Sequence, residues 1–465
     1  MSLPPLPDVD FVVPGDTELV SFSVICRPAG VQSVEEFRER VLAGDVDSLL
    51  PDEAVLDRVS EQLRGYGFEV LDVPAHLRAG GIDAATHLPV PVVFARGTVG
   101  RFRDVFRVEL TRMIRRSDDR DLRHEVSAIV LRGRTSLELP TAISDALVVT
   151  IPEPPLLAMS SDDVVAGNDV CLSLPDAVAH VTRAEAVHSR WKPGEPREPV
   201  RAAVIDTGFA QHRYFEQRAY RITRVAAPDT NQPDVDPRSH GTFVLANLLA
   251  CAPECDAFGV KFLNIDIAFG TAMLIAGVRV ISVSWVFETG SEPVPDWVLT
   301  LEFLILVAVK KLGIVVVVGS GNATNETTPA RLPHVVAVGG VAVDNAFSLR
   351  AWPQSTSFAS RRDPARVVPD LCGVASQINL PMAPAGMECR EGATSCATPQ
   401  VAGVAVLLLQ KNRRLTAFEV KALLMLGARD VRFGSSFGGH QAGPGPDLAT
   451  GFGLVDALTS WNLVP

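Results

Sequence analysis

Residues 201–208 read Arg-Ala-Ala-Val-Ile-Asp-Thr-Gly, a short apolar run that ends in an acid and a glycine. Its small and β-branched residues are typical of a strand buried on both faces of a sheet. Similar runs follow at 257–262, 278–283 and 314–318. Helical patterns separate them at 242–251, 271–277 and 297–312. This alternation predicts an α/β fold, with a parallel sheet covered by helices on both faces.

The longest apolar stretch, 265–287, is interrupted by Asp266 and Arg279, and its second half is rich in β-branched residues. It is predicted to be a buried helix followed by a buried strand, and no transmembrane helix is expected.

Four polar residues stand at the ends of these elements, where open parallel sheets place their sites. Asp206 ends the first strand, and His240 opens an apolar helix in Ser-His-Gly-Thr. Asn322 follows the strand in Gly-Ile-Val-Val-Val-Val-Gly-Ser-Gly-Asn, and Ser395 opens a long apolar helix in Gly-Ala-Thr-Ser. Each has an ordinary structural explanation by itself, as a turn residue or a helix cap.

Together the four residues form a set with one chemistry. A serine hydroxyl is a poor nucleophile until a base removes its proton, and a neutral histidine is a suitable base near pH 7. A carboxylate then orients the imidazole and stabilises the imidazolium. The amide of Asn322 and the backbone N–H of Ser395 are suitable donors to the oxyanion that forms. The residues Asp206, His240 and Ser395 are therefore the predicted catalytic triad.

The order Asp, His, Asn, Ser, with these flanking residues, resembles the subtilase family of serine peptidases. The resemblance extends from about residue 176 to the C-terminus and includes lesser segments at 251–263, 329–339 and 451–457. It implies a subtilisin-like fold and hydrolysis of peptide bonds through an acyl-enzyme. The resemblance also implies an enzyme that requires no cofactor and whose partners are peptide or protein substrates.

Three positions next to the catalytic residues depart from the family. Phe243 stands where a second histidine is usual, Ala393 replaces the glycine two residues before the nucleophile, and Cys396 replaces the methionine that usually follows it. None of these changes removes a triad group, although Ala393 could alter the approach to Ser395.

The resemblance also implies the residues that bind substrate, which are Ser284, Trp285, Val286, Gly319, Ser320 and Gly321. The first three stand where the family commonly has Ser-Leu-Gly, in a strand that pairs with extended substrate. Val286 would narrow the space for the P1 side chain, which predicts a preference for small P1 residues. The alternative is that Trp285 and Phe287 are core residues.

Residues 18–151 resemble a different protein, the propeptide of the sedolisin (kumamolisin-like) peptidases. The patterns that carry this resemblance lie at 53–70, 99–110 and 137–149. They imply an α+β, ferredoxin-like prodomain that acts as an intramolecular inhibitor, and a permanent partner domain is the alternative. Sedolisins use Glu and Asp in place of His, and an Asp at the oxyanion position. The histidine at 240 and the asparagine at 322 therefore favour the subtilisin mechanism.

The predicted organisation is a leader at 1–17, the prodomain at 18–151, a linker at 152–190 and the catalytic domain at 191–465. Proline-rich and glycine-rich segments at 152–155 and 192–199 favour the linker. We expect a maturation cut between about 155 and 187.

Composition limits the other classes of function. The formal net charge of −11 argues against a broad nucleic-acid or anionic-membrane surface. No secretory signal is recognised at the N-terminus, which predicts a cytoplasmic protein, with other export routes open, and reduced thiols at its seven cysteines.

No metal site is assigned. Cys251 and Cys255 lack the further ligands of a zinc site and are read as structural thiols. Asp229, Asp234 and Asp236 offer oxygens, but their spacing forms no calcium-binding motif, so structural calcium is left unassigned.

Three functions stay open at this level. The first is an active endopeptidase made as a zymogen. The second is a silent binding protein whose intact triad is held shut by the N-terminal domain. The third is an intracellular processing protease with one dedicated client.

Overall fold

The computed structural model describes residues 8–72, 77, 90–116, 125–131, 137, 139–152, 170–190, 199–289 and 294–465. Its centre is an eight-stranded sheet with the strand order β16-β15-β13-β11-β8-β10-β9, in which β19 also pairs with β15. The strands are β8 (Arg201–Asp206), β9 (Ile222–Ala226), β10 (Asp256–Lys261), β11 (Val278–Val283), β13 (Val315–Gly319), β15 (Val336–Val343), β16 (Leu349–Ala351) and β19 (Leu371–Val374). All pairs are parallel except β15 with β16. The predicted α/β fold is confirmed.

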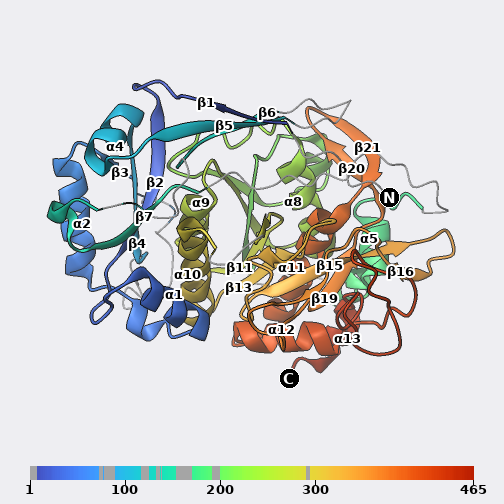
Figure 1. The fold of residues 1–465 in the computed structure, drawn as a ribbon. Helices are drawn as coiled ribbons and strands as arrows, with labels where there is room; N and C mark the ends of the chain where they lie inside the picture. The colour runs from blue at the N-terminus through green and yellow to red at the C-terminus, as the bar shows by residue number, and fades with distance from the viewer. Residues whose placement is uncertain are drawn as a thin grey trace.

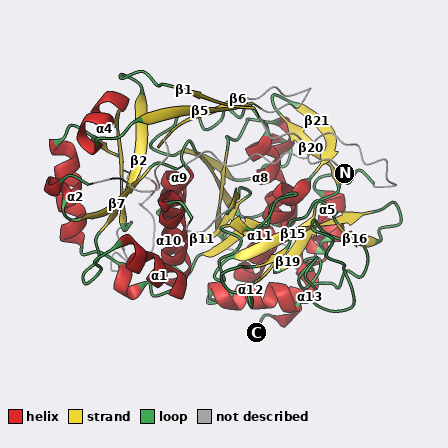
Figure 2. Cartoon of the chain, in the orientation of Figure 1, coloured by secondary structure: helices red, strands yellow, loops and turns green. Residues whose placement is uncertain are grey.

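Helices cover both faces of this sheet because its strands are apolar on both sides. One face carries α8 (His240–Cys251) and α11 (Ala393–Lys411), which contact each other, and the other carries α9 (Ile265–Met273) and α10 (Asp296–Lys310). Shorter helices near the C-terminus are α12 (Ala417–Leu426) and α13 (Ala457–Leu463). Figure 2 shows the two helix layers around the sheet.

Two predictions about the apolar elements can now be judged. The stretch 265–287 does form a buried helix and then a buried strand, as expected, but the helix is α9 and not 271–277. Helix α11 is long and apolar enough to cross a membrane, yet 89% of its apolar window is buried inside the protein. It is the central core helix of the α/β unit.

The N-terminal region is an α+β unit with a four-stranded antiparallel sheet in the order β3-β4-β2-β7. Its elements are β2 (Leu19–Cys26), α1 (Val34–Ala43), α2 (Glu53–Gly65), β3 (Glu69–Val70), β4 (Val92–Thr98), α4 (Val99–Phe106) and β7 (Ala146–Thr150). This strand order is that of the ferredoxin-like fold, as predicted, and the elements follow its β-α-β-β-α-β succession apart from the additional helix α1, which contacts α10, and the strands inserted between α4 and β7. A separate three-stranded sheet, β1 (Asp8–Val12), β5 (Leu110–Arg116) and β6 (Glu125–Leu131), extends from it.

The two faces of the four-stranded sheet bury different surfaces, because side chains alternate along a strand. Phe22 on β2 packs edge to face against Phe68 and Phe102 in a core of the N-terminal unit itself. Ile25 on β2 and Phe94 on β4 point the other way, into the core shared with the α/β unit.

Helices α9 and α10 receive that second face, and Figure 1 shows them between the N-terminal sheet and the central sheet. The hydroxyls of Thr150 and Thr300 lie 2.9 Å apart, and Arg38 forms a 2.6 Å ion pair with Asp296. Lys310 Nζ donates to the carbonyl of Gly44 at 2.7 Å. The N-terminal unit is therefore packed onto the α/β unit through buried contacts.

The predicted linker, 152–190, needs correction at its C-terminal end. Residues 170–190 form α5 (Asp176–Val181) and α6 (Ala184–His188), which contribute the fully buried Val178 and Val187 to the main core. They belong to the α/β unit, because their apolar side chains pack on it. Residues 153–169, with much of the expected cleavage region, lie outside the described residues.

The expectation of reduced thiols is wrong for one pair. Cys171 forms a disulfide with Cys389 on the hairpin of β20 (Gln377–Met382) and β21 (Gly386–Glu391). The next residue, Leu172, is also joined to this hairpin, because its backbone forms hydrogen bonds with Gln377 and Asn379 of β20. The remaining five cysteines are free and buried.

Candidate active site

The turn after β8 and the first turn of α8 bring Asp206 and His240 together. A Cβ at Gly241 would lie 2.2 Å from the carbonyl oxygen of Gly208 and 2.8 Å from Cβ of Asp206. Only a glycine allows this approach, which explains why it follows the histidine. The Ser239 hydroxyl, just before the helix, accepts a hydrogen bond from the N–H of Ala383, next to β20.

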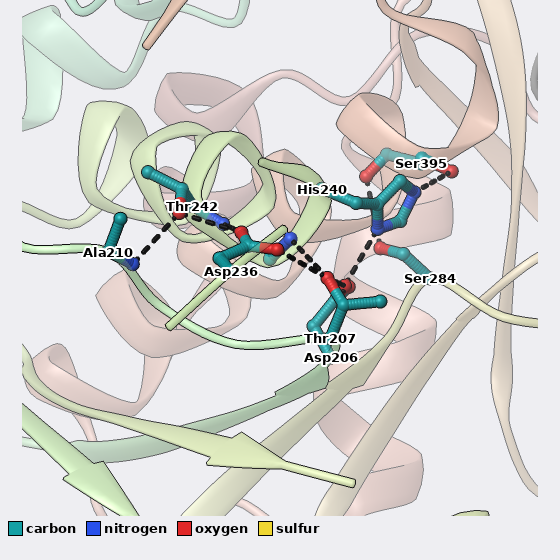
Figure 3. A network of polar contacts seen from close by, with 9 residues as sticks. Asp206, Thr207, Ala210, Asp236, His240, Thr242, Ser284 and Ser395 are labelled. Carbon is teal, nitrogen blue, oxygen red and sulfur yellow. Dashed lines mark hydrogen bonds and ion pairs between the residues drawn. The ribbon is translucent and has the colours of Figure 1, made fainter. Parts of the chain in front are cut away.

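The three predicted catalytic residues form one hydrogen-bonded chain (Figure 3). Nδ1 of His240 lies 2.8 Å from Oδ1 of Asp206, and Nε2 lies 3.1 Å from Oγ of Ser395. Asp206 is fully buried and His240 is 3% exposed, whereas Ser395 is half-buried. The hydroxyl at the end of the chain is thus the part that a substrate can reach.

Ser395 lies in the first turn of α11, where the helix dipole and the unpaired N–H groups favour negative charge. The Ser284 hydroxyl donates to the Ser395 carbonyl at 3.0 Å. Ala393 has a φ of +53°, in the left-handed region that favours glycine. The alanine that replaces the family's glycine at this position therefore strains the backbone locally, and the hydrogen-bond distances of the triad are retained.

Asn322 lies beside this helix N-terminus, as predicted for an oxyanion donor. Its Oδ1 accepts hydrogen bonds from the backbone N–H of Thr394 at 3.1 Å and from the Thr394 hydroxyl at 2.7 Å. Two donors to the same oxygen define the orientation of the amide, and the Nδ2 atom is its donor group.

A second buried carboxylate, Asp236, supports the site and was missed in this role. One of its oxygens accepts from the Thr207 hydroxyl at 2.8 Å, and the other accepts from the Thr242 N–H at 2.9 Å and the Thr242 hydroxyl at 2.7 Å. Burial, followed by the charge of Asp206, raises the pKa of Asp236 above its usual range. The motif Asp-Pro-Arg-Ser-His was the available signal.

The aspartates considered for calcium do not act as a set. Asp236 is engaged with the two threonines, Asp229 accepts from the N–H and the side-chain amide of Asn264, and Asp234 is exposed. Among the described residues, no group of three or more His, Cys, Asp or Glu is arranged to hold a metal ion. Burial raises the pKa of Cys251 and Cys255 to about 12 each, as expected of structural thiols.

The predicted substrate strand divides into two kinds of residue. Ser284 and Val286 are half-buried, and the Ser284 hydroxyl contacts Ser395, whereas Trp285 and Phe287 are 3% and 5% exposed. The Trp285 ring packs against His240, and the Phe287 ring packs against Trp297. The core alternative is correct for both aromatic side chains.

The segment 319–321 is also buried. Ser320 is fully buried, its N–H donates to the Val338 carbonyl at 2.8 Å, and its own carbonyl accepts from Thr327 at 2.7 Å. Ser320 is thus enclosed by the fold, and its assignment as a substrate-binding residue stays a prediction. Gly319 and Gly321 are buried as well, and Gly321 has a φ of +111°.

Comparison with known proteins agrees with this geometry. A model of the subtilase family matches residues 199–453, more than half of the chain. The chain is 28% identical to Subtilisin E of Bacillus subtilis over 300 residues, which is 60% of this chain and 72% of that protein. It is 30% identical to Subtilisin of Bacillus pumilus over 286 residues, which is 57% of this chain and 94% of that protein.

Among solved structures, a lanthipeptide protease matches with a TM-score of 0.49 and 20% identity, over 62% of this chain and 94% of that one. The family match covers the strand of Asp206, the helix of His240, the loop of Asn322 and the helix of Ser395. The chain therefore belongs to the subtilase family of serine peptidases.

Proposed function

We propose that this chain is an active serine endopeptidase that cleaves peptide bonds through an acyl-enzyme on Ser395. The observation that carries the proposal is the unbroken chain of hydrogen bonds from Asp206 through His240 to the half-buried Ser395. A nucleophile, a base and a group that orients the base are the elements that acyl transfer needs.

The reaction would proceed by proton transfers along this chain. His240 Nε2 takes the proton of Ser395 as Oγ attacks the peptide carbonyl, and Asp206 stabilises the imidazolium at Nδ1. Asn322 Nδ2 and the N–H of Ser395 donate to the oxyanion. The imidazolium then protonates the leaving amine, and water hydrolyses the ester by the reverse sequence.

The N-terminal domain is proposed to be the intramolecular inhibitor of a zymogen. It buries apolar side chains, threonine hydroxyls and an ion pair against α9 and α10, as a specific partner would. The maturation cut is proposed to fall within 153–169, because residues 170–190 are packed in the catalytic core and are poor protease substrates.

Gel electrophoresis tests the position of this cut. A cut before Cys171 releases the N-terminal domain on reducing and non-reducing gels alike, because the disulfide joins only catalytic-domain segments. A cut between Cys171 and residue 190 would leave the fragments linked until they are reduced. The second result would contradict the proposed cleavage region.

Two narrower features remain proposals. Half-buried Val286 supports a preference for small P1 residues, which profiling on a peptide library would test. The Cys171–Cys389 pair favours function in an oxidising compartment over the predicted cytoplasmic location. Thiol labelling of the protein isolated from its source cells decides between these compartments.

A further inference from the structure

Two aromatic rings from separate elements contact the imidazole of His240. Phe243 lies one turn further along α8, with its ring centroid 4.8 Å from that of His240 and the planes at 62°. Trp285 follows β11, with its ring centroid 4.9 Å from that of His240 and the planes at 46°. Phe262, directly after β10, packs edge to face against Trp285, with the ring centroids 5.2 Å apart and the planes at 82°.

These rings are enclosed and not part of an exposed substrate surface. Phe243 is 5% exposed, Trp285 is 3% exposed and His240 itself is 3% exposed. In a close-packed interior a ring turns only if its neighbours move. Both nitrogens of the imidazole already have partners, so a turn of the ring would also break the hydrogen bonds to Asp206 and Ser395.

The contacts also have an electrostatic consequence. The imidazole becomes a cation in the proposed mechanism, and an aromatic ring attracts a cation that lies over its face within about 6 Å of the ring centroid. The charged groups around the imidazole are Asp206, which contacts Nδ1, Asp236, which accepts a hydrogen bond from Thr207, and Arg238. The charge of Arg238 interacts with both carboxylates. Cys396 on α11 stays neutral, because burial raises the pKa of its thiol.

We propose that Phe243 and Trp285 form an aromatic clamp, a pair of positioning residues that holds His240 between Asp206 and Ser395 and stabilises its protonated form. The proposal rests on the proposed function, since the benefit arises when His240 acts as the base. It assigns a role to two residues that the catalytic chain itself does not contain.

Substitution of Trp285 gives the main test. Trp285→Leu keeps an apolar side chain but removes the aromatic face. We expect kcat to fall about tenfold with little change in KM, and the acid limb of the pH–rate profile to move about half a pH unit lower. Trp285→Phe restores an aromatic face and should recover most of both effects. Phe243→Leu should move the acid limb in the same direction.

Trp297→Leu is the matched control, because the ring of this tryptophan packs on Phe287 at a centroid distance of 4.6 Å, whereas the described rings that pack on His240 are those of Phe243 and Trp285. It should leave the acid limb in place. Coincident pH profiles for the wild type and Trp285→Leu would overturn the clamp, as would an equal shift in Trp297→Leu.

A second measurement does not depend on turnover. The protonation of His240 can be followed by NMR of carbon-13-labelled histidine in the full chain, with the signal assigned by its loss in His240→Gln. The clamp requires the midpoint to be lower in Trp285→Leu than in wild type, and an equal midpoint would contradict it. Failure of wild type to react with a fluorophosphonate would reject the proposed function separately.

Discussion

The hydroxyl of Ser23, on β2 of the N-terminal domain, donates a hydrogen bond to the carboxylate of Asp266 on α9 of the catalytic domain. Both residues are fully buried. The carboxylate also accepts the N–H of Ile267 at 2.9 Å. A polar contact at the centre of an apolar interface makes the docking of the two domains sensitive to protonation.

Burial raises the pKa of Asp266 to about 6, while an exposed aspartate titrates near 4. Because the folded state binds this proton more tightly than the unfolded state, the group contributes to the stability of the fold at acid pH. This contribution is complete below about pH 4 and is lost as the pH rises through about 6. Asp266→Asn should therefore stabilise the protein relative to wild type at pH 8, by up to about 3 kcal/mol, and have little effect at pH 4. Denaturant unfolding at both pH values measures this difference.

His334 is expected to show the opposite dependence of stability on pH, because its pKa is lowered. Burial, and then the charges of Lys310, Lys421 and Arg366, lower the pKa of His334 to about 4. The contribution of His334 to the stability of the fold is therefore fully present above about pH 6.5 and is lost as the pH falls through about 4. His334→Gln should change stability on the acid side only. An Asp266→Asn effect that is equal at pH 4 and pH 8 would contradict the assignment.

The strain at Ala393 predicts a stabilising substitution. A left-handed alanine costs about 1–2 kcal/mol, and glycine adopts this φ freely. Ala393→Gly should raise the free energy of unfolding by about 1 kcal/mol, after the greater entropy of the unfolded glycine chain is included. Ala397→Gly in the interior of the same helix should lower it by about 1 kcal/mol. Parallel denaturation curves test both, and a destabilised Ala393→Gly variant would count against the strain.

Asn322 is expected to act on the transition state and not on substrate binding. Asn322→Ala removes the side-chain donor and should lower kcat by about 100- to 1000-fold, with KM nearly unchanged. Asn325→Ala is the control, because this residue of the same loop is exposed and its backbone N–H and side-chain amide both donate to Glu288. Equal losses in the two variants would indicate a disturbed loop instead of a lost oxyanion donor.

The Cys171–Cys389 disulfide closes a sequence separation of 218 residues. Replacing both cysteines by alanine should lower the free energy of unfolding by about 2–4 kcal/mol. A reducing agent should destabilise wild type by a similar amount and leave the double variant unchanged. Thermal unfolding with and without reductant measures both, and a wild type that is insensitive to a verified reduction would show that the bond contributes little.

Local patterns predicted the strands and helices that carry the candidate site well. The apolar runs at 202–205, 257–262, 278–283 and 314–318 became β8, β10, β11 and β13 with small shifts at their ends. The triad residues were recognised because each ends or begins an element with a distinctive motif. The strand order then brings them together, with the hydrogen-bond distances already described.

The features that were missed depend on contacts between distant segments. The start of α9 follows Asn264, which is bound to Asp229, 35 residues earlier. Cys171 and Cys389 could not be paired, because connectivity does not follow from the spacing of cysteines. The role of Asp236 in the site depends on Thr207, directly after β8, and Thr242 in α8, which only the folded chain places around it.

The reactivity of Ser395 tests the central claim most directly. A fluorophosphonate probe should label wild type, before or after the N-terminal domain is removed by limited proteolysis, and the label should map to Ser395. Labelling should disappear in Ser395→Ala and fall by several orders of magnitude in His240→Ala. A folded wild type that stays unlabelled from pH 5 to pH 10, with and without its N-terminal domain, would contradict the account.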